Sequence, residues 1–187
     1  DGVQRARVGV VAAEHEEDPV EGDDAGAVAP RLTVDENGVR GDEPGFDKDN
    51  VAVYGTWMEN SGGGDGQTQW SFLAATTEWS HTDGPWSDNY KYDDEGFQAT
   101  IDWWYSLVEK GYMPSFDIQQ GVGWADQLLA GKVAMVSNGS WMTGYLFGQA
   151  SDIFEPTLVP TPIGPNGERA SMYNGLADNI FVGTEHP

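Results

Sequence analysis

The sequence has no cysteine and few basic side chains among its 187 residues. The lack of cysteine excludes disulfides, thiolate metal sites and a cysteine nucleophile. Lys and Arg number 9 against 31 Asp and Glu, which gives a formal net charge of −22. Nucleic acid and anionic lipid are bound through basic patches that displace counterions, so this charge balance argues against both. We therefore expect no nucleic-acid partner.

Long apolar runs and familiar catalytic motifs are missing as well. No window approaches the roughly 18 consecutive apolar residues of a membrane span, and no signal peptide is visible. There is no Gly-x-Ser-x-Gly elbow, no His-Glu-x-x-His and no dinucleotide fingerprint. His81 has no partner at a ligand spacing, and His15 and His186 lie near the two ends. We expect no catalytic residue, no metal and no cofactor.

Aromatic side chains are abundant instead. The chain carries 8 Trp, 7 Tyr and 7 Phe. An acidic, polar and tryptophan-rich composition suits carbohydrate recognition, because rings stack on sugar faces while carboxylates and amides bind hydroxyl groups. The length is enough for one domain with a core, or for one domain and a small additional piece.

The first 30 residues have no Leu, Ile, Phe or Trp, and their Val and Ala follow neither a strand nor a helix period. Such a segment buries too little apolar area to offset the entropy of ordering. We predict a disordered or non-native acidic arm over residues 1–31. The next segment, 32–50, is a turn-rich acidic connector in which Asp35 and Asn37 lack the later ligands of a calcium loop.

The remaining patterns predict alternating strands and helices, which favours an α/β layered fold. The elements expected are a strand at 51–54, a glycine-rich loop at 60–66, helices at 69–78, 94–110 and 121–131, a strand at 132–137, a helix at 140–149, an extended proline-rich edge at 151–165 and a last strand at 179–183. A loop or hairpin fills 79–93. The helix at 94–110 carries an apolar stripe that we expect to face the core, formed by Phe97, Ile101, Trp104 and Val108.

Three places offer ligand-binding side chains at the ends of these elements. Trp141 follows a predicted strand at the start of a helix, where an indole face adjoins backbone N–H groups without helical partners. Trp70 follows the glycine-rich loop, and Tyr173 with Asn174 and Gly175 precedes the predicted last strand. Each also has a structural interpretation, because the tryptophans suit a core or core edge and the third group suits an ordinary turn. For Trp141 the pattern alone favours the core.

Two blocks, Ala130–Met135 and Asn138–Trp141, together resemble the signature of extracellular solute-binding proteins of bacterial sugar ABC transporters, the maltose-binding-protein-like family 1. Segments at 70–75, 107–114 and 159–167 are also similar to that family. The resemblance covers roughly residues 32–187. It implies a periplasmic-binding-protein-like α/β fold, of which this chain holds mostly one lobe, a mixed sheet flanked by helices.

On this resemblance, residues 32–155 form the second lobe and 156–187 the segment that crosses back toward a first lobe, itself mostly absent. Trp141 stacks on a sugar ring, Trp70 lines the cleft, and Asn174 and Gly175 pass the ligand. Family members are more than twice this long, so we expect a fragment. The family has a helix where residues 1–30 stand here, which motivates the hypothesis of a shifted reading frame or a gene-fragment artefact for that arm.

The expected function is the substrate-binding component of a carbohydrate ABC importer, without enzymatic activity. Its expected partners are a sugar or oligosaccharide and the membrane permease, and we expect a monomer. The full-length protein is expected outside the cytoplasm, periplasmic or extracellular, anchored as a lipoprotein by a signal outside this sequence. Alternatives are a secreted glycoside-active enzyme that uses two of the many acids, a non-catalytic carbohydrate-binding module, and an inert acidic interaction fragment.

Overall fold

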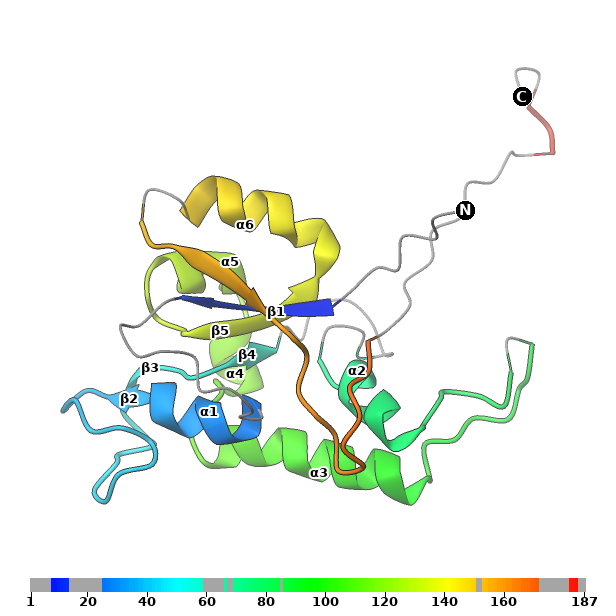
Figure 1. Cartoon of the computed structure of the whole chain (residues 1–187), viewed down its shortest axis with the longest axis horizontal. Helices are drawn as coiled ribbons and strands as arrows, with labels where there is room; N and C mark the ends of the chain where they lie inside the picture. Colours follow the sequence, from blue (N-terminus) through cyan, green and yellow to red (C-terminus); the bar gives the residue numbers. More distant parts are fainter. Residues whose placement is uncertain are drawn as a thin grey trace.

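The computed structural model describes residues 8–13, 25–58, 66, 69–84, 86–150, 153–171 and 182–184. The strands are β1 (Val8–Ala13), β2 (Val34–Asp35), β3 (Val51–Val53), β4 (Trp57–Met58), β5 (Met135–Gly139) and β6 (Pro156–Val159). The helices are α1 (Ala25–Leu32), α2 (Ser71–Ala74) with the 3-10 turn η1 (Ala75–Thr77), α3 (Glu95–Glu109), α4 (Phe116–Gln119), α5 (Trp124–Leu129), the 3-10 turn η2 (Ser140–Met142) and α6 (Thr143–Ala150). Figure 1 shows their arrangement.

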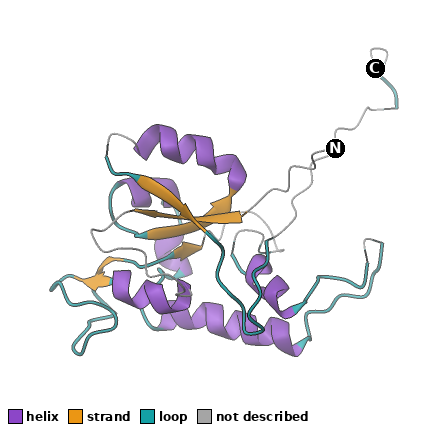
Figure 2. Ribbon diagram, in the orientation of Figure 1, coloured by secondary structure: helices purple, strands orange, loops and turns teal. Residues whose placement is uncertain are grey.

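The main sheet has the strand order β4-β5-β1-β6, and β2 pairs with β3 in a separate two-stranded ribbon. Strand β4 runs parallel to β5, whereas β1 runs antiparallel to both β5 and β6. Strands β4, β5 and β6 therefore point in the same direction, and β1 alone is reversed. In Figure 2 this sheet lies at the centre with helices on both sides.

Strand β1 lies within residues 1–31, for which the sequence predicts a disordered or non-native acidic arm. It pairs with β5 from Val8 opposite Gly139 to Ala12 opposite Met135, and with β6 along its other side. Helix α1 adds a second regular element to the same range. Strand β1 has no Leu or Ile, and backbone hydrogen bonds to its two neighbouring strands order it. A prediction based on apolar composition does not detect a strand of this kind. The domain boundaries after residues 31 and 155 stay a prediction, and the sheet takes strands from all three ranges.

Two apolar clusters cover opposite faces of β5. On one face, Val136 packs with Leu128 of α5 and Leu146 of α6, in a cluster that includes Trp57 and Trp124. On the other face, Met135 packs with Ala29 of α1. The two helix layers are visible on either side of the sheet in Figure 1. Since consecutive strand residues point to opposite faces, β5 holds both layers together.

A third cluster joins α2 and α3 to the edge strand β4. Met58 of β4 packs with Phe72 of α2, Leu107 of α3 and Met113. Burying one such leucine or phenylalanine side chain stabilises the fold by about 1.5–3 kcal/mol relative to exposure. This cluster fixes the position of α2, and with it the position of Trp70 at the amino end of that helix.

Helix α3 forms where the sequence predicts it. The Asp94 carboxylate accepts hydrogen bonds from the N–H groups of Gly96 at 2.9 Å and Phe97 at 3.1 Å, which caps the helix. The predicted stripe is only half-buried, and the most buried side chains of α3 are Thr100 and Leu107. Trp104 and Val108 of the stripe pack against the cluster that contains Leu107, whereas Phe97 contacts the rings of Trp79 and Tyr92.

The other predicted elements differ mainly at their ends. The short helix at 124–129 and the edge strand at 156–159 lie within their predicted ranges. The strand predicted at 132–137 is paired in the main sheet only from Met135, while Val133 makes an isolated parallel bridge to Tyr54. Of the predicted last strand, only residues 182 and 183 are described, and they form a turn.

One buried carboxylate organises the acidic connector. Asp35 accepts hydrogen bonds from the backbone N–H groups of Asn37, Val39 and Asp47, at 2.8, 2.9 and 2.9 Å. The hydrogen bond from Asp47 is the largest cause that lowers the pKa of Asp35, and burial opposes it.

Over the described residues, no helix combines the length and apolar character needed to cross a membrane.

Candidate ligand-binding site

The carboxyl ends of β4, β5 and β6 meet at one edge of the main sheet, because these three strands are parallel. Trp70 follows β4, Trp141 follows β5, and the segment 160–171 follows β6. Ligands of open α/β sheets bind outside the carboxyl ends of the strands. We call this region, at the carboxyl ends of β4, β5 and β6, the sheet edge. The predicted site residues all belong to segments that follow these strands in the sequence.

Trp141 lies against the backbone of Gly139, the last residue of β5. A Cβ built on Gly139 would overlap the six-membered ring of the indole, so only glycine leaves room for the ring there. The Trp141 side chain is nevertheless 51% exposed. One face of the ring is therefore supported by the chain and another part is open to solvent. The interpretation of Trp141 as a core residue does not fit this exposure.

The turn before Trp141 is held by an amide. Asn138 is buried, and its Oδ1 accepts a hydrogen bond of 2.7 Å from the N–H of Gly139. Ser137 is also buried, and its Oγ has no hydrogen-bond partner within the described part of the chain. In the parallel pairing of β4 with β5, Ser137 lies opposite Met58, the last residue of β4.

Tyr145 is a candidate site residue that sequence reasoning did not single out. It lies one helical turn after Trp141 and is 44% exposed. Between and beyond the two aromatics, Gly144 and Gly148 face open space. Residues spaced by three and four share one face of a helix, so the i, i+4 spacing of the two aromatics is the signal that identifies Tyr145. Leu146 points the other way, into the core.

Trp70 is half-buried, which places it between the two interpretations that its pattern left open. Its indole lies against Gly66, where a built Cβ would overlap the ring. It also contacts Phe97 edge-on, with ring centroids 5.2 Å apart, and Trp79 at 5.9 Å. No ring contact between described residues joins Trp70 to Trp141. Each tryptophan thus rests on a glycine, Trp70 on Gly66 and Trp141 on Gly139.

The segment after β6 runs past α2 and α3, as Figure 1 shows. A Cβ built on Gly164 would overlap the side chain of Thr76 in η1, so the two segments pack closely. A turn follows, closed by a hydrogen bond of 3.0 Å from Gly167 N–H to the Gly164 carbonyl, as its Gly-Pro-Asn-Gly sequence predicts. Tyr173, Asn174 and Gly175 follow this turn but lie outside the described residues, so their role stays a prediction.

Partial burial raises the pKa of the Tyr54 phenol. Side chains of His, Asp and Glu form no group of three that suits a metal ion, within the residues that the structure describes. The sheet edge presents aromatic rings, glycines and small polar groups, which suit a neutral polar ligand.

No protein-family model matches the sequence, and no curated protein sequence matches it. Solved structures do match. UspC from M. tuberculosis has a TM-score of 0.70 and 20% identity, over 89% of this chain and 44% of UspC. The ABC substrate-binding protein Lmo0181 from Listeria monocytogenes, solved with cycloalternan, has a TM-score of 0.61 and 16% identity, over 89% of this chain and 38% of its own.

A third match is the maltose/maltodextrin-binding domain MalE from Bdellovibrio bacteriovorus, bound to maltotriose. Its TM-score is 0.60 at 13% identity, over 89% of this chain and 41% of MalE. These likenesses show that the chain has the periplasmic-binding-protein fold, as the resemblance predicts. The chain spans less than half the length of each of these three proteins, which corresponds to one lobe.

Proposed function

We propose that this chain is one lobe of the solute-binding component of a carbohydrate ABC importer, and that it binds a neutral sugar at the sheet edge. The observation that carries the proposal is the seat of Trp141. Its indole rests on Gly139 at the carboxyl end of β5 and remains 51% exposed. A supported, half-open aromatic ring at this position suits stacking on a sugar face.

The roles of the other site residues follow from their positions. Trp70 lines the same edge after β4, and Tyr145 extends the aromatic surface along α6. Ring stacking contributes on the order of 1 kcal/mol per ring, by analogy with aromatic pairs. Tyr173, Asn174 and Gly175 are assigned to the segment that passes the ligand, where an amide binds sugar hydroxyls. Asparagine supplies both donors and an acceptor for this purpose.

The wider role is also part of the proposal. Two structural neighbours were solved with carbohydrate, Lmo0181 with cycloalternan and MalE with maltotriose. We assign this chain to a protein that works outside the cytoplasm as a monomer, anchored as a lipoprotein, and that delivers sugar to a membrane permease. A binding protein needs no catalytic pair, so we propose no enzymatic activity. A product assay after incubation with oligosaccharides tests this point, because cleavage would favour a glycoside-active enzyme.

The direct test is a sugar screen by saturation-transfer NMR, which detects weak binding. One lobe supplies part of the contacts, so we expect a Kd in the millimolar range, about −4 kcal/mol. Trp141→Ala should weaken binding of disaccharides and trisaccharides about fivefold without unfolding the chain. Phe116→Ala is the matched control, because Phe116 is 60% exposed and lies away from the proposed site. It follows Tyr112 by four residues, and the Tyr112 carbonyl accepts a hydrogen bond from the N–H of Thr56 at the amino end of β4, the end opposite to the sheet edge. Equal affinities for Trp141→Ala and the unmodified chain would remove Trp141 from the site.

A further inference from the structure

The loop between η1 and α3 exposes several aromatic side chains. We call residues 79–93 the aromatic loop; residue 85 lies outside the described part. In Figure 1 this loop projects beyond α2 and α3, away from the sheet. Trp86 is 98% exposed, Tyr90 65% and Tyr92 39%. Three large exposed rings on one short loop form a surface that needs an explanation, since isolated exposed rings are common but clusters mark contact sites.

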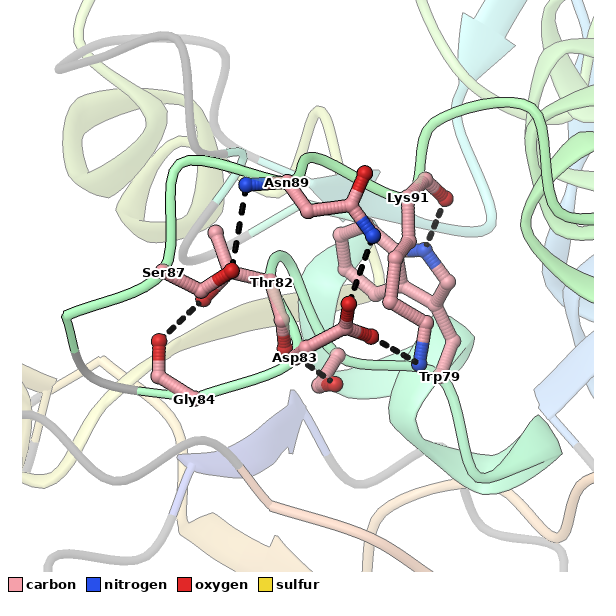
Figure 3. Close-up of polar contacts among 8 residues, drawn as sticks. Trp79, Thr82, Asp83, Gly84, Ser87, Asn89 and Lys91 are labelled. Atoms are coloured by element: carbon pink, nitrogen blue, oxygen red, sulfur yellow. Dashed lines mark hydrogen bonds and ion pairs between the residues drawn. The ribbon is translucent and has the colours of Figure 1, made fainter.

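Polar contacts hold the aromatic loop in one shape (Figure 3). The Trp79 Nε1–H donates to the Lys91 carbonyl at 2.7 Å, and the Lys91 N–H donates to the His81 carbonyl at 3.0 Å. Asn89 Nδ2 donates to Asp83 Oδ2 at 2.5 Å, and the other oxygen of Asp83 lies 3.9 Å from Lys91 Nζ. A loop held this way presents its rings with little further loss of conformational entropy on binding.

The rings of Tyr90 and Tyr92 are stacked, and we call this pair the platform. Their planes differ by 14° and their centroids lie 6.2 Å apart. Tyr90 lies in an isolated bridge, and Tyr92 lies in the turn that precedes α3. The antiparallel bridge from Thr82 to Tyr90 fixes this segment. Tyr92 is further supported from below by Phe97, edge-on at 5.2 Å.

The platform is connected to Trp70 by an unbroken series of ring contacts. Tyr92 lies 5.7 Å from Trp79, measured between ring centroids, and Trp79 lies 5.9 Å from Trp70. Trp79 is only 6% exposed and anchors the series. The exposed end of the series is therefore at Tyr90, and the other end is Trp70, a residue of the proposed site.

The charge on the aromatic loop restricts what it binds. Asp83, Asp88 and Asp93 lie on it, and its one cationic side chain, Lys91, is near Asp83. An anionic partner is disfavoured by these acids and by the net charge of −22. Parallel rings bordered by carboxylates and an amide match the chemistry of a neutral glycan chain, in which apolar sugar faces alternate with hydroxyl groups.

We propose that the aromatic loop is an outer contact surface for a neutral oligosaccharide, with Trp86, Tyr90 and Tyr92 binding sugar units beyond those held at the sheet edge. This inference rests on the proposed function and specifies its ligand class: chains of several units rather than single sugars or disaccharides. A longer glycan gains contacts on the loop that a shorter homologue does not reach.

The test compares short and long homologues on the full chain, with maltotriose against maltoheptaose and cellotriose against cellohexaose as probes. We expect the longer member of one pair to bind more tightly. The double variant Trp86→Ala/Tyr90→Ala should weaken binding of that longer member by about fivefold per ring lost and leave the shorter member unchanged. Both side chains are exposed, so the melting temperature should not change. The variant Trp86→Phe/Tyr90→Phe keeps the rings and should keep the preference for length.

Each failure has its own pattern. Equal affinity for long and short homologues in the unmodified chain, or an unchanged ratio in the alanine double variant, overturns the loop proposal and leaves the sheet-edge proposal standing. Trp141→Ala should weaken both lengths. If it weakens neither, while the loop variant still weakens the longer homologue, the sheet-edge proposal fails and the aromatic loop is a glycan contact independent of it. No binding of any probe by the unmodified chain overturns both.

Discussion

Replacing Gly139 with alanine places a methyl group where the six-membered ring of Trp141 lies. The backbone at Gly139 has φ −79° and ψ 155°, an extended conformation that alanine adopts without strain. The substitution therefore acts through one steric overlap. The atoms that meet the new methyl group belong to the far end of the indole, so the indole swings away while the backbone stays in place.

The expected effect on stability is small. Moving the indole off its rotamer costs about 0.5–1.5 kcal/mol. Replacing glycine with alanine at a compatible position stabilises the fold by about 0.4–1 kcal/mol through the unfolded chain. The two contributions nearly cancel, and a net change below about 1 kcal/mol shifts the Tm of a chain of this size by less than about 4 °C.

The expected effect on binding is larger in relative terms. A displaced indole loses its stacking on the ligand, on the order of 1 kcal/mol, which corresponds to about fivefold weaker binding. The measurements are a thermal melt and an NMR titration with a trisaccharide that binds the unmodified chain. Gly84→Ala is the matched control, because a Cβ on Gly84 meets no atom within 4 Å. Unchanged affinity in Gly139→Ala would refute the stacking role, and a fall in Tm above about 10 °C would show that the indole is structural.

Two further predictions concern stability. Leu146 is 1% exposed in the cluster between α6 and β5. Leu146→Ala should therefore lower the free energy of unfolding by about 2–5 kcal/mol, measured by denaturant titration. Phe147→Ala is the control and should change it much less, because Phe147 is 38% exposed. Folding lowers the pKa of Asp35 from an unfolded value near 3.8. At a pH above the unfolded pKa the ionised carboxylate therefore stabilises the fold, and this contribution is lost as the pH falls through the lower folded pKa. Asp35→Asn should therefore lower Tm at pH 7 and show less additional loss on acidification, and parallel Tm curves for the two proteins from pH 7 to pH 3 would contradict this role.

Local signals in the sequence determined the elements that depend on neighbouring residues. The helix that begins after Asp94 has its cap and its acidic first turn in the sequence, and Gly111, at φ +79°, follows its end. The prolines of the segment after residue 151 indicate an edge strand, and β6 lies at the edge of the sheet. The block that ends at Trp141 resembles one protein family, and this resemblance predicts the fold that the structural neighbours share.

Tertiary structure decided what depends on contacts distant in sequence. Strand β1 is central because its backbone pairs with β5 and β6, more than 120 residues away, and composition carries no trace of such pairing. Leu107 is the most deeply buried apolar residue of α3, and Trp104 and Val108 of the predicted stripe pack half-buried against the same cluster. Which position is deepest depends on the direction from which α2 packs, and the helix alone does not encode that direction. Trp141 has the same residue pattern whether it is buried or exposed. Its half-open position follows from the ring resting on Gly139, and only the folded chain shows that the ring lies on glycine with its remaining surface in solvent.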